Sequence, residues 1–301
     1  MKSKDKIHPA HIVEIVTPKK FLLNGLWFGP YTKSGKPKKP KRVIIWVHGL
    51  TSSAFSRLPI VRELISRGTA VLTFSNRGHD VISRLPRIDG TKGALMGKAH
   101  EVFTECVDDI QGAIDFVRRA GGRQIYLAGH STGCQKSIYW ASKKKTRGIA
   151  GIILLAPLSD YADAATFDSG GRLARATRMA RALVRGGKPH QLLPYVLWPG
   201  IADAQRFLSL HTPDSIEQSI FPYFDTKRKP KIFASIRKPV LVLLAEKDEY
   251  ADRPAKKIAA WFKEHARSRR FELKIVPGVG HSFKGAEKQV ADHIKGFVNS
   301  L

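Results

Sequence analysis

Six short apolar runs most constrain the fold of this chain. They are RVIIWV (42–47), TAVLTFS (69–75), QIYLAG (124–129), IAGIILLAP (149–157), PVLVLLA (239–245) and ELKIVPG (272–278). Runs without polar alternation are typical of strands buried on both faces, as in a parallel sheet. Helical periodicity lies between or after them at 59–67, 101–119, 132–141, 255–265 and 286–298. The alternation predicts an α/β fold whose mostly parallel central sheet is flanked by helices.

Two segments depart from this alternation. Residues 1–42 contain a predicted hairpin (11–30) that turns at Thr17–Lys20, followed by a basic loop (32–42) expected near an edge of the core sheet. Residues 160–237 carry six prolines and no strand-like run, and they include one helical stretch at 172–185. We therefore expect a core made of 43–159 and 238–301, with 160–237 inserted as a mainly helical cap.

The cap leaves two questions open. Arginines recur at helical spacing at 172, 175, 178, 181 and 185. Such a stripe is usually a solvated face, but beside a cleft it would attract carboxylates or phosphates. Apolar residues of the cap either line an acyl pocket or form the cap's own core: Leu192, Leu193, Tyr195, Trp198, Phe207, Leu208 and Leu210.

Net charge is unusual, because 52 Lys and Arg stand against 25 Asp and Glu to give +27. An excess of this size favours anionic partners such as nucleic acid, yet charge also serves solubility alone. We interpret it as a surface property and do not expect nucleic-acid binding. The oligomeric state is left open.

Other classes of chemistry have little support in the sequence. Cys106 and Cys134 are too few for a disulfide framework, and neither a zinc motif nor a phosphate-binding glycine loop occurs. We expect no cofactor and no metal. The chain also lacks a signal-peptide pattern and an apolar run long enough to span a membrane, so a cytoplasmic location is expected.

The pentapeptide GHSTG (129–133) lies between a predicted strand and a predicted helix. A strand–turn–helix with this pattern is a nucleophile elbow, in which a strained turn exposes the serine hydroxyl at the carboxyl end of the sheet. Gly129 and Gly133 are needed because larger residues would clash with adjacent chain. Ser131 is therefore the candidate nucleophile.

A serine needs a base, and the base needs an acid that orients it. His281 follows the last predicted strand and Asp248 follows the strand before it. The order Ser131, Asp248, His281 is that of an α/β-hydrolase triad. Glu246, Glu249 and Asp252 are neighbouring acids that could compete with Asp248.

An oxyanion hole would complete the site. The backbone N–H of Thr132 begins a helix directly after the serine, and the turn His48-Gly49 can aim the N–H of Leu50 at the same point. His48 is expected to fix this loop rather than to react, and Gly49, Gly129 and Gly133 to be structural.

The motifs HGL (48–50), NRGHD (76–80), GHSTG (129–133), EKDEY (246–250) and GVGHSF (278–283) resemble those of α/β-hydrolase superfamily serine hydrolases. SNRGHD and GHSTGCQKSIYW also resemble hydrolases related to siderophore esterases. The resemblance implies an acyl-enzyme mechanism on a small-molecule ester, with Ser131 attacking, His281 moving the proton and Asp248 holding His281.

Three alternatives remain for the function. The same triad serves thioesterases, lactonases and amidases. An arginine-lined cleft would favour an anionic substrate. A non-catalytic protein that binds an anion or nucleic acid on this scaffold is the alternative outside enzymes.

Overall fold

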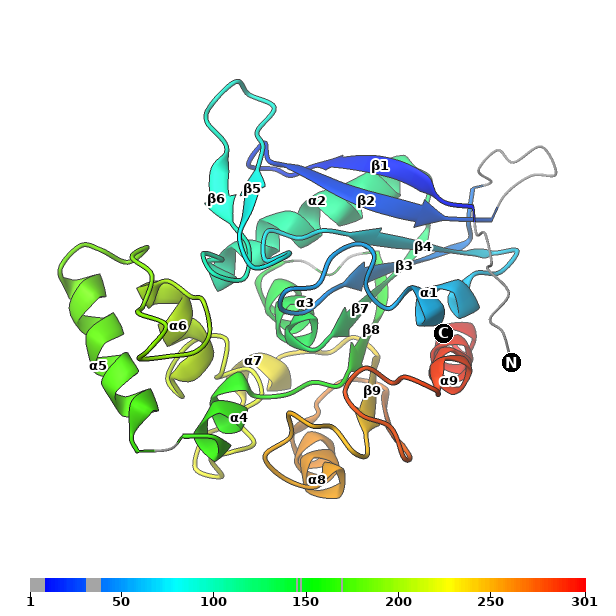
Figure 1. Ribbon diagram of the computed structural model, residues 1–301. Coiled ribbons are helices and arrows are strands. Elements are labelled where there is room, and N and C mark those ends of the chain that lie inside the picture. The colour runs from blue at the N-terminus through cyan, green and yellow to red at the C-terminus, as the bar shows by residue number, and fades with distance from the viewer. Residues whose placement is uncertain (1–8, 31–38, 145, 147, 169) are drawn as a thin grey trace, which may run out of the picture.

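An eight-stranded sheet forms the centre of the computed structural model, which describes residues 9–30, 39–144, 146, 148–168 and 170–301 (Figure 1). The strand order is β1-β2-β4-β3-β7-β8-β9-β10. The first two strands pair antiparallel, β2 pairs antiparallel with β4, and the remaining neighbours are parallel. The strands are β1 (His11–Val16), β2 (Leu22–Phe28), β3 (Arg42–Val47), β4 (Thr69–Phe74), β7 (Gln124–His130), β8 (Ile149–Leu155), β9 (Val240–Ala245) and β10 (Phe271–Val276). This confirms the predicted α/β fold class.

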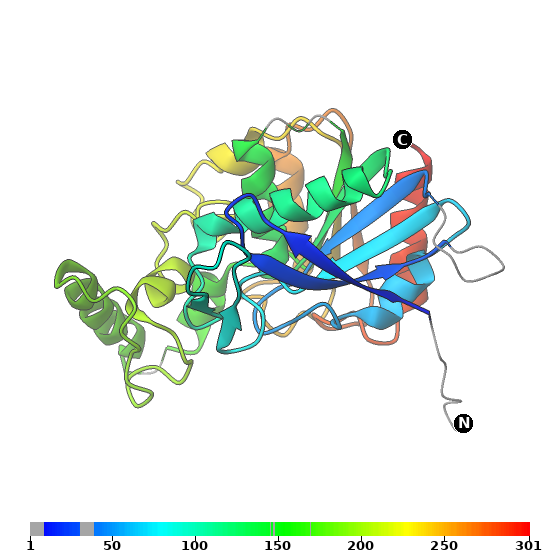
Figure 2. The same ribbon diagram turned by 90° about the horizontal axis from the view of Figure 1, so that it is seen from above.

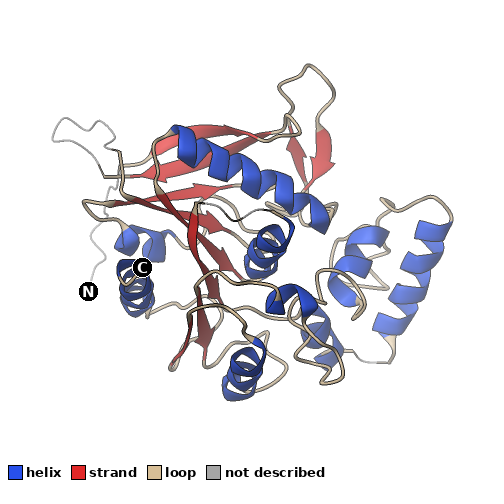
Figure 3. Cartoon of the chain, turned by 180° about the vertical axis from the view of Figure 1, so that it is seen from behind, coloured by secondary structure: helices blue, strands red, loops and turns tan. Residues whose placement is uncertain are grey.

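Helices cover both faces of the sheet (Figures 2 and 3). α1 (Leu58–Leu64) and α9 (Glu287–Asn299) pack on one face, and α2 (Cys106–Arg119), α3 (Thr132–Lys143) and α8 (Ala255–His265) on the other. Along β3, Val43 and Ile45 belong to one apolar cluster while Ile44 and Trp46 belong to the other. A strand buried on both faces has no polar side, which explains its unbroken apolar sequence.

One predicted helix start is wrong. The helix expected over 101–119 begins at Cys106, after a 3₁₀ turn η1 (Phe103–Glu105). Val102 has extended backbone, and Glu101 is fully buried in ion pairs with Lys136 and Arg206. These contacts hold the chain before α2 in a non-helical path.

The N-terminal hairpin forms as β1 and β2, with β1 at an edge of the sheet. Of the basic loop 32–42, residues 32–38 lie outside the described part. A second small hairpin, β5 (Ser83–Leu85) and β6 (Ala94–Met96), was not predicted, because strands of three residues carry almost no periodicity.

The described residues of 160–237 include four helices where the sequence indicated one: α4 (Asp160–Thr166), α5 (Arg172–Arg185), α6 (Ala204–His211) and α7 (Lys231–Ala234). α5 and α6 pack together beside the sheet (Figure 1). Leu193 and Phe207 belong to an apolar cluster of this region, against which Trp198 and Leu208 pack. Leu210 is buried, whereas Leu192 and Tyr195 are exposed. All five arginines of α5 are exposed.

Candidate active site

Ser131 lies at the tip of the turn between β7 and α3. Its φ of 56° and ψ of −131° are strained for a residue with a side chain. The backbone N–H of Ser131 donates to the Leu155 carbonyl (2.9 Å), and the Ser131 carbonyl accepts from the N–H of Cys134 (2.8 Å). The neighbouring strand and the first helical turn therefore hold the strained conformation.

Glycines around this turn are required by space. A Cβ on Gly129 would lie 2.3 Å from the Gly133 carbonyl oxygen, and one on Gly133 would lie 2.0 Å from the Val47 carbonyl oxygen. A Cβ on Gly49 would lie 2.7 Å from the Cβ of Ser131. The loop after β3 and the turn after β7 thus approach each other at distances that only glycine permits.

His281 and Asp248 meet at the carboxyl ends of β9 and β10. The His281 Nδ1 lies 2.9 Å from Asp248 Oδ2 and 3.1 Å from Oδ1. With Nδ1–H donating to the carboxylate, Nε2 remains free to accept a proton. Both side chains are almost completely buried, which strengthens their interaction.

The competing acids have other partners. Glu249 accepts the backbone N–H of His281 (2.7 Å), and Glu246 accepts that of Gly278 (2.8 Å). Asp252 pairs with Arg253 at 2.7 Å. Asp248 is the acid that contacts the His281 ring among the described residues.

Leu50 lines the same cavity as Ser131, and Thr132 is the first residue of α3. Among the described residues, neither backbone N–H has a hydrogen-bond acceptor. His48 Nδ1–H donates to the Gly49 carbonyl (2.8 Å), and its Nε2 accepts from the N–H of Asn76 (3.0 Å). Burial, followed by the charge of Lys136, lowers the pKa of His48 to about 3. The imidazole therefore stays neutral and supports the loop.

His130 is a site residue that the sequence analysis missed. It precedes Ser131, and its Nε2–H donates to the backbone carbonyl of His281 (3.0 Å). The two rings lie 4.9 Å apart. Burial and the neighbouring His281 lower the pKa of His130 well below its usual value, so it is a neutral donor. Its position within GHSTG was visible in the sequence, but a contact with His281 depends on tertiary structure.

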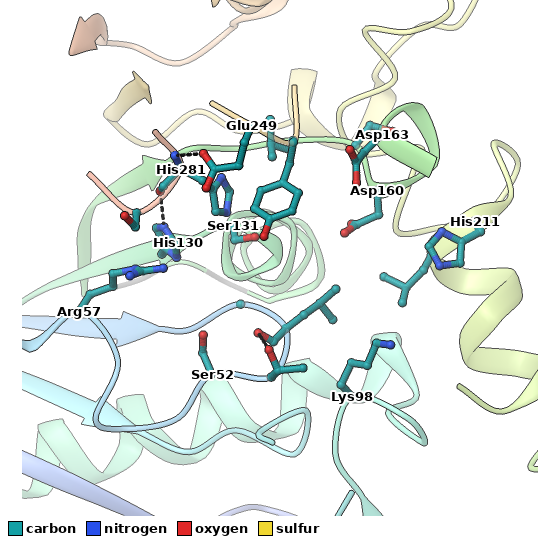
Figure 4. Close-up of a pocket in the computed structure, with 18 of the residues that line it drawn as sticks. Ser52, Arg57, Lys98, His130, Ser131, Asp160, Asp163, His211, Glu249 and His281 are labelled. Carbon is teal, nitrogen blue, oxygen red and sulfur yellow. Dashed lines mark hydrogen bonds between the residues drawn. The ribbon is translucent and has the colours of Figure 1, made fainter. Parts of the chain in front are cut away.

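Ser131 and His281 line one cavity of about 550 Å³ (Figure 4). No hydrogen bond joins these two side chains among the described residues. The wall has mixed charge, because Arg57 and Lys98 share it with three acids: Asp160, Asp163 and Glu249. The arginines of α5 do not line this cavity. Of the apolar residues named in the sequence analysis for 160–237, Trp198 and Leu210 line this cavity.

None of these three acids forms a salt bridge with a cation among the described residues, and the pKa of two of them is strongly raised. Burial, followed by the charge of Glu217, raises the pKa of Asp160 to about 7. Burial, followed by the charge of Asp248, raises the pKa of Asp163 to about 6. Figure 4 shows both side chains on the side of the cavity away from Arg57. This part of the wall changes charge near neutral pH.

Metal and thiol chemistry are separate from this cavity. Within the described ranges, one group of side chains has donor atoms close enough together to bind a metal ion: His100, His190 and Asp203. None of these three residues lines the cavity. Cys106 and Cys134 are free and buried, and burial raises the pKa of each thiol well above its usual value.

Solved structures similar to this chain include a siderophore hydrolase of Aspergillus fumigatus, with a TM-score of 0.69 and 17% identity, covering 99% of each chain. An esterase of Pyrococcus furiosus has a TM-score of 0.61 and 17% identity, covering 97% of this chain and 91% of its own. Est1E of Butyrivibrio proteoclasticus with ferulic acid bound has a TM-score of 0.63 and 19% identity, covering 96% of this chain and 98% of its own. This likeness, together with the mostly parallel sheet, shows the α/β-hydrolase fold.

None of the helices within the described ranges has both the length and the apolar character needed to cross a lipid bilayer. A comparison with curated protein sequences found no match. Residues 93–299, which include Ser131, Asp248 and His281, match the family described as "Protein of unknown function (DUF1749)". The chain therefore belongs to this family.

Proposed function

We propose that this protein is a serine hydrolase that cleaves carboxylic esters through an acyl-enzyme intermediate. The observation that carries the proposal is that His281, hydrogen-bonded to Asp248, lines the same cavity as the strained Ser131. Structural relatives named as esterases and hydrolases support the same reaction class.

Each residue has a defined role in this proposal. Ser131 Oγ attacks the ester carbonyl while its proton passes to His281 Nε2, and Asp248 stabilises the imidazolium through Nδ1–H. The N–H groups of Leu50 and Thr132 donate to the oxyanion. His281 then protonates the leaving alkoxide, and a water that it deprotonates releases the acid and restores Ser131.

The Ser131–His281 hydrogen bond required for this step is expected on substrate binding, since such bonds are often long before a substrate is present. The oxyanion donors are expected to contribute strongly, because the loss of one such donor typically costs about 10²–10³ in kcat.

The cavity supports a small polar substrate. A volume of about 550 Å³ suits a small ligand, and charged and hydroxyl-bearing residues outnumber aliphatic ones along the wall. Because the wall carries both signs of charge, we infer a neutral ester with polar substituents in place of an anionic one. Thioesters, lactones and amides are tested beside esters, since the triad alone does not distinguish these bonds.

A substrate panel compares short neutral, hydroxylated and carboxylated esters with matched thioesters, lactones and amides. Ser131→Ala is expected to reduce ester hydrolysis to the background rate. Ser52→Ala is the matched control, because Ser52 also lines the cavity, and it is expected to keep most activity. Equal ester hydrolysis by Ser131→Ala and the parent would refute the proposal.

A further inference from the structure

We propose that His100, His190 and Asp203 form a zinc site that fastens the cap to the core. His100 Nδ1 lies 3.0 Å from Asp203 Oδ2, and His190 Nδ1 lies 2.9 Å from the same oxygen. All three donor atoms lie within 4.8 Å of one another. Two imidazole nitrogens and one carboxylate oxygen are donors that suit Zn²⁺. The site is independent of the proposed hydrolysis and departs from the expectation of no metal.

The charge of Asp203 is the first argument. Its side chain is fully buried, and its Oδ1 accepts the backbone N–H of Arg206 (2.8 Å). No Lys or Arg side chain of the described residues pairs with this carboxylate. The Arg206 guanidinium is instead occupied by Glu101 (3.0 Å) and Glu217 (2.6 Å). A buried carboxylate without a cation is costly, and a divalent ion between it and the two imidazoles would compensate its charge.

Two of the three donor-atom separations need little adjustment, and the third, between the two imidazoles, is at most 4.8 Å. Zinc bonds of about 2.0–2.2 Å at tetrahedral angles separate two ligand atoms by about 3.3 Å. The present separations of 2.9 and 3.0 Å would have to open by a few tenths of an ångström. The His190 side chain is 62% exposed and has space to move, whereas His100 and Asp203 are buried. Because the His190 side of the site faces solvent, a water molecule would occupy the fourth coordination position of the ion.

Backbone hydrogen bonds already hold the ligand-bearing segments together. The Asp203 N–H donates to the Ala99 carbonyl (2.8 Å), next to His100. Beside His190, the N–H of Ala204 donates to the Gln191 carbonyl (3.0 Å), and that of Gln205 donates to Pro189 (3.0 Å). A preorganised set of ligands lowers the entropic cost of binding an ion.

Zinc at this position would join two parts of the fold. His100 lies between β6 and η1 in the core, whereas His190 and Asp203 lie near the two ends of the segment that connects α5 to α6. The same connection includes Ile201, whose carbonyl accepts from the cavity residue Lys98 (3.1 Å). The ion would therefore hold the cap beside the mouth of the cavity.

Titration with Co²⁺ and then Zn²⁺ tests the site on untagged, chelator-treated full-length protein. We expect about one equivalent of Co²⁺ to give the visible absorption of a four-coordinate ion and Zn²⁺ to displace it. Zn²⁺ at about a hundredfold excess over its Kd should raise Tm by about 5 °C. His190→Ala should lose the absorption and the Tm shift, while His265→Ala, which lies outside the cluster, should keep both.

Asp203→Asn is a second variant, because its amide oxygen can still accept the Arg206 N–H while the charge is lost. It should fold and bind Co²⁺ at least tenfold more weakly. Equal binding by the parent and His190→Ala would overturn the proposal. So would absence of the Co²⁺ absorption in the parent, which would leave the three residues as a hydrogen-bonded bridge only.

Discussion

Gly49 and Ser131 lie so close together that a Cβ on Gly49 would be 2.7 Å from the Cβ of Ser131. This contact joins the loop that carries Leu50 to the turn that carries the proposed nucleophile. Two loops from different strands are thereby held at a fixed separation, which a preorganised oxyanion site requires.

Gly49→Ala is expected to lower kcat/KM for a good ester by about 100-fold, because the added methyl group must displace Ser131 or the Leu50 N–H. Steady-state kinetics measure the loss. Gly296→Ala in α9 is the control, since a Cβ there would have no atom within 4 Å apart from its own helix backbone and chain neighbours, and a helical alanine should be neutral or slightly stabilising. Full activity in Gly49→Ala would show that this contact does not fix the site.

Asp248 and Glu249 are adjacent acids with different contacts to His281. Asp248→Asn should lower kcat by about 10⁴-fold, because the amide no longer stabilises the imidazolium or selects its tautomer. Glu249→Gln keeps an oxygen that can accept the His281 backbone N–H, and it should cost less than about tenfold. Kinetics on both purified variants provide the comparison, and an equal loss would contradict the assigned roles.

Asp163 should make stability depend on pH. Burial and the charge of Asp248 raise the pKa of Asp163 from 3.8 to about 6. Between about pH 4 and pH 6, the folded state therefore keeps a proton on Asp163 that the unfolded state has already released. The free energy of unfolding should therefore fall as pH rises through this range.

Urea unfolding of Asp163→Asn from pH 4 to 8 tests this prediction. The free energy of unfolding should fall less steeply with pH in the variant than in the parent, and the variant should be the more stable protein at pH 8. Asp214→Asn, at an exposed position of the cap, should leave the slope unchanged. An Asp163→Asn curve parallel to that of the parent would contradict the account.

The strands and helices of the core could be predicted from the sequence because each has a recognisable local pattern of apolar residues. Strands such as β9 are buried on both faces and read as unbroken apolar runs, and α8 has the predicted bounds of 255–265. Ser131, Asp248 and His281 could be proposed as site residues because each follows a recognisable strand.

Features that depend on distant contacts could not be predicted in this way. His130 contacts His281 across 151 positions of sequence, and Asp203 contacts His100 across 103. Three described helices within 160–237 were missed because they are short, with eight residues or fewer. The exposure of the α5 arginines depended on how α5 packs against α6.

Covalent labelling of Ser131 is the most direct test of the central claim. Purified protein is treated with a fluorophosphonate, and the modified peptide is identified by mass spectrometry. We expect one adduct per chain, located on Ser131, retained in Ser52→Ala and formed much more slowly in His281→Ala. An adduct on another residue, or a parent protein that hydrolyses esters without labelling at Ser131, would contradict it.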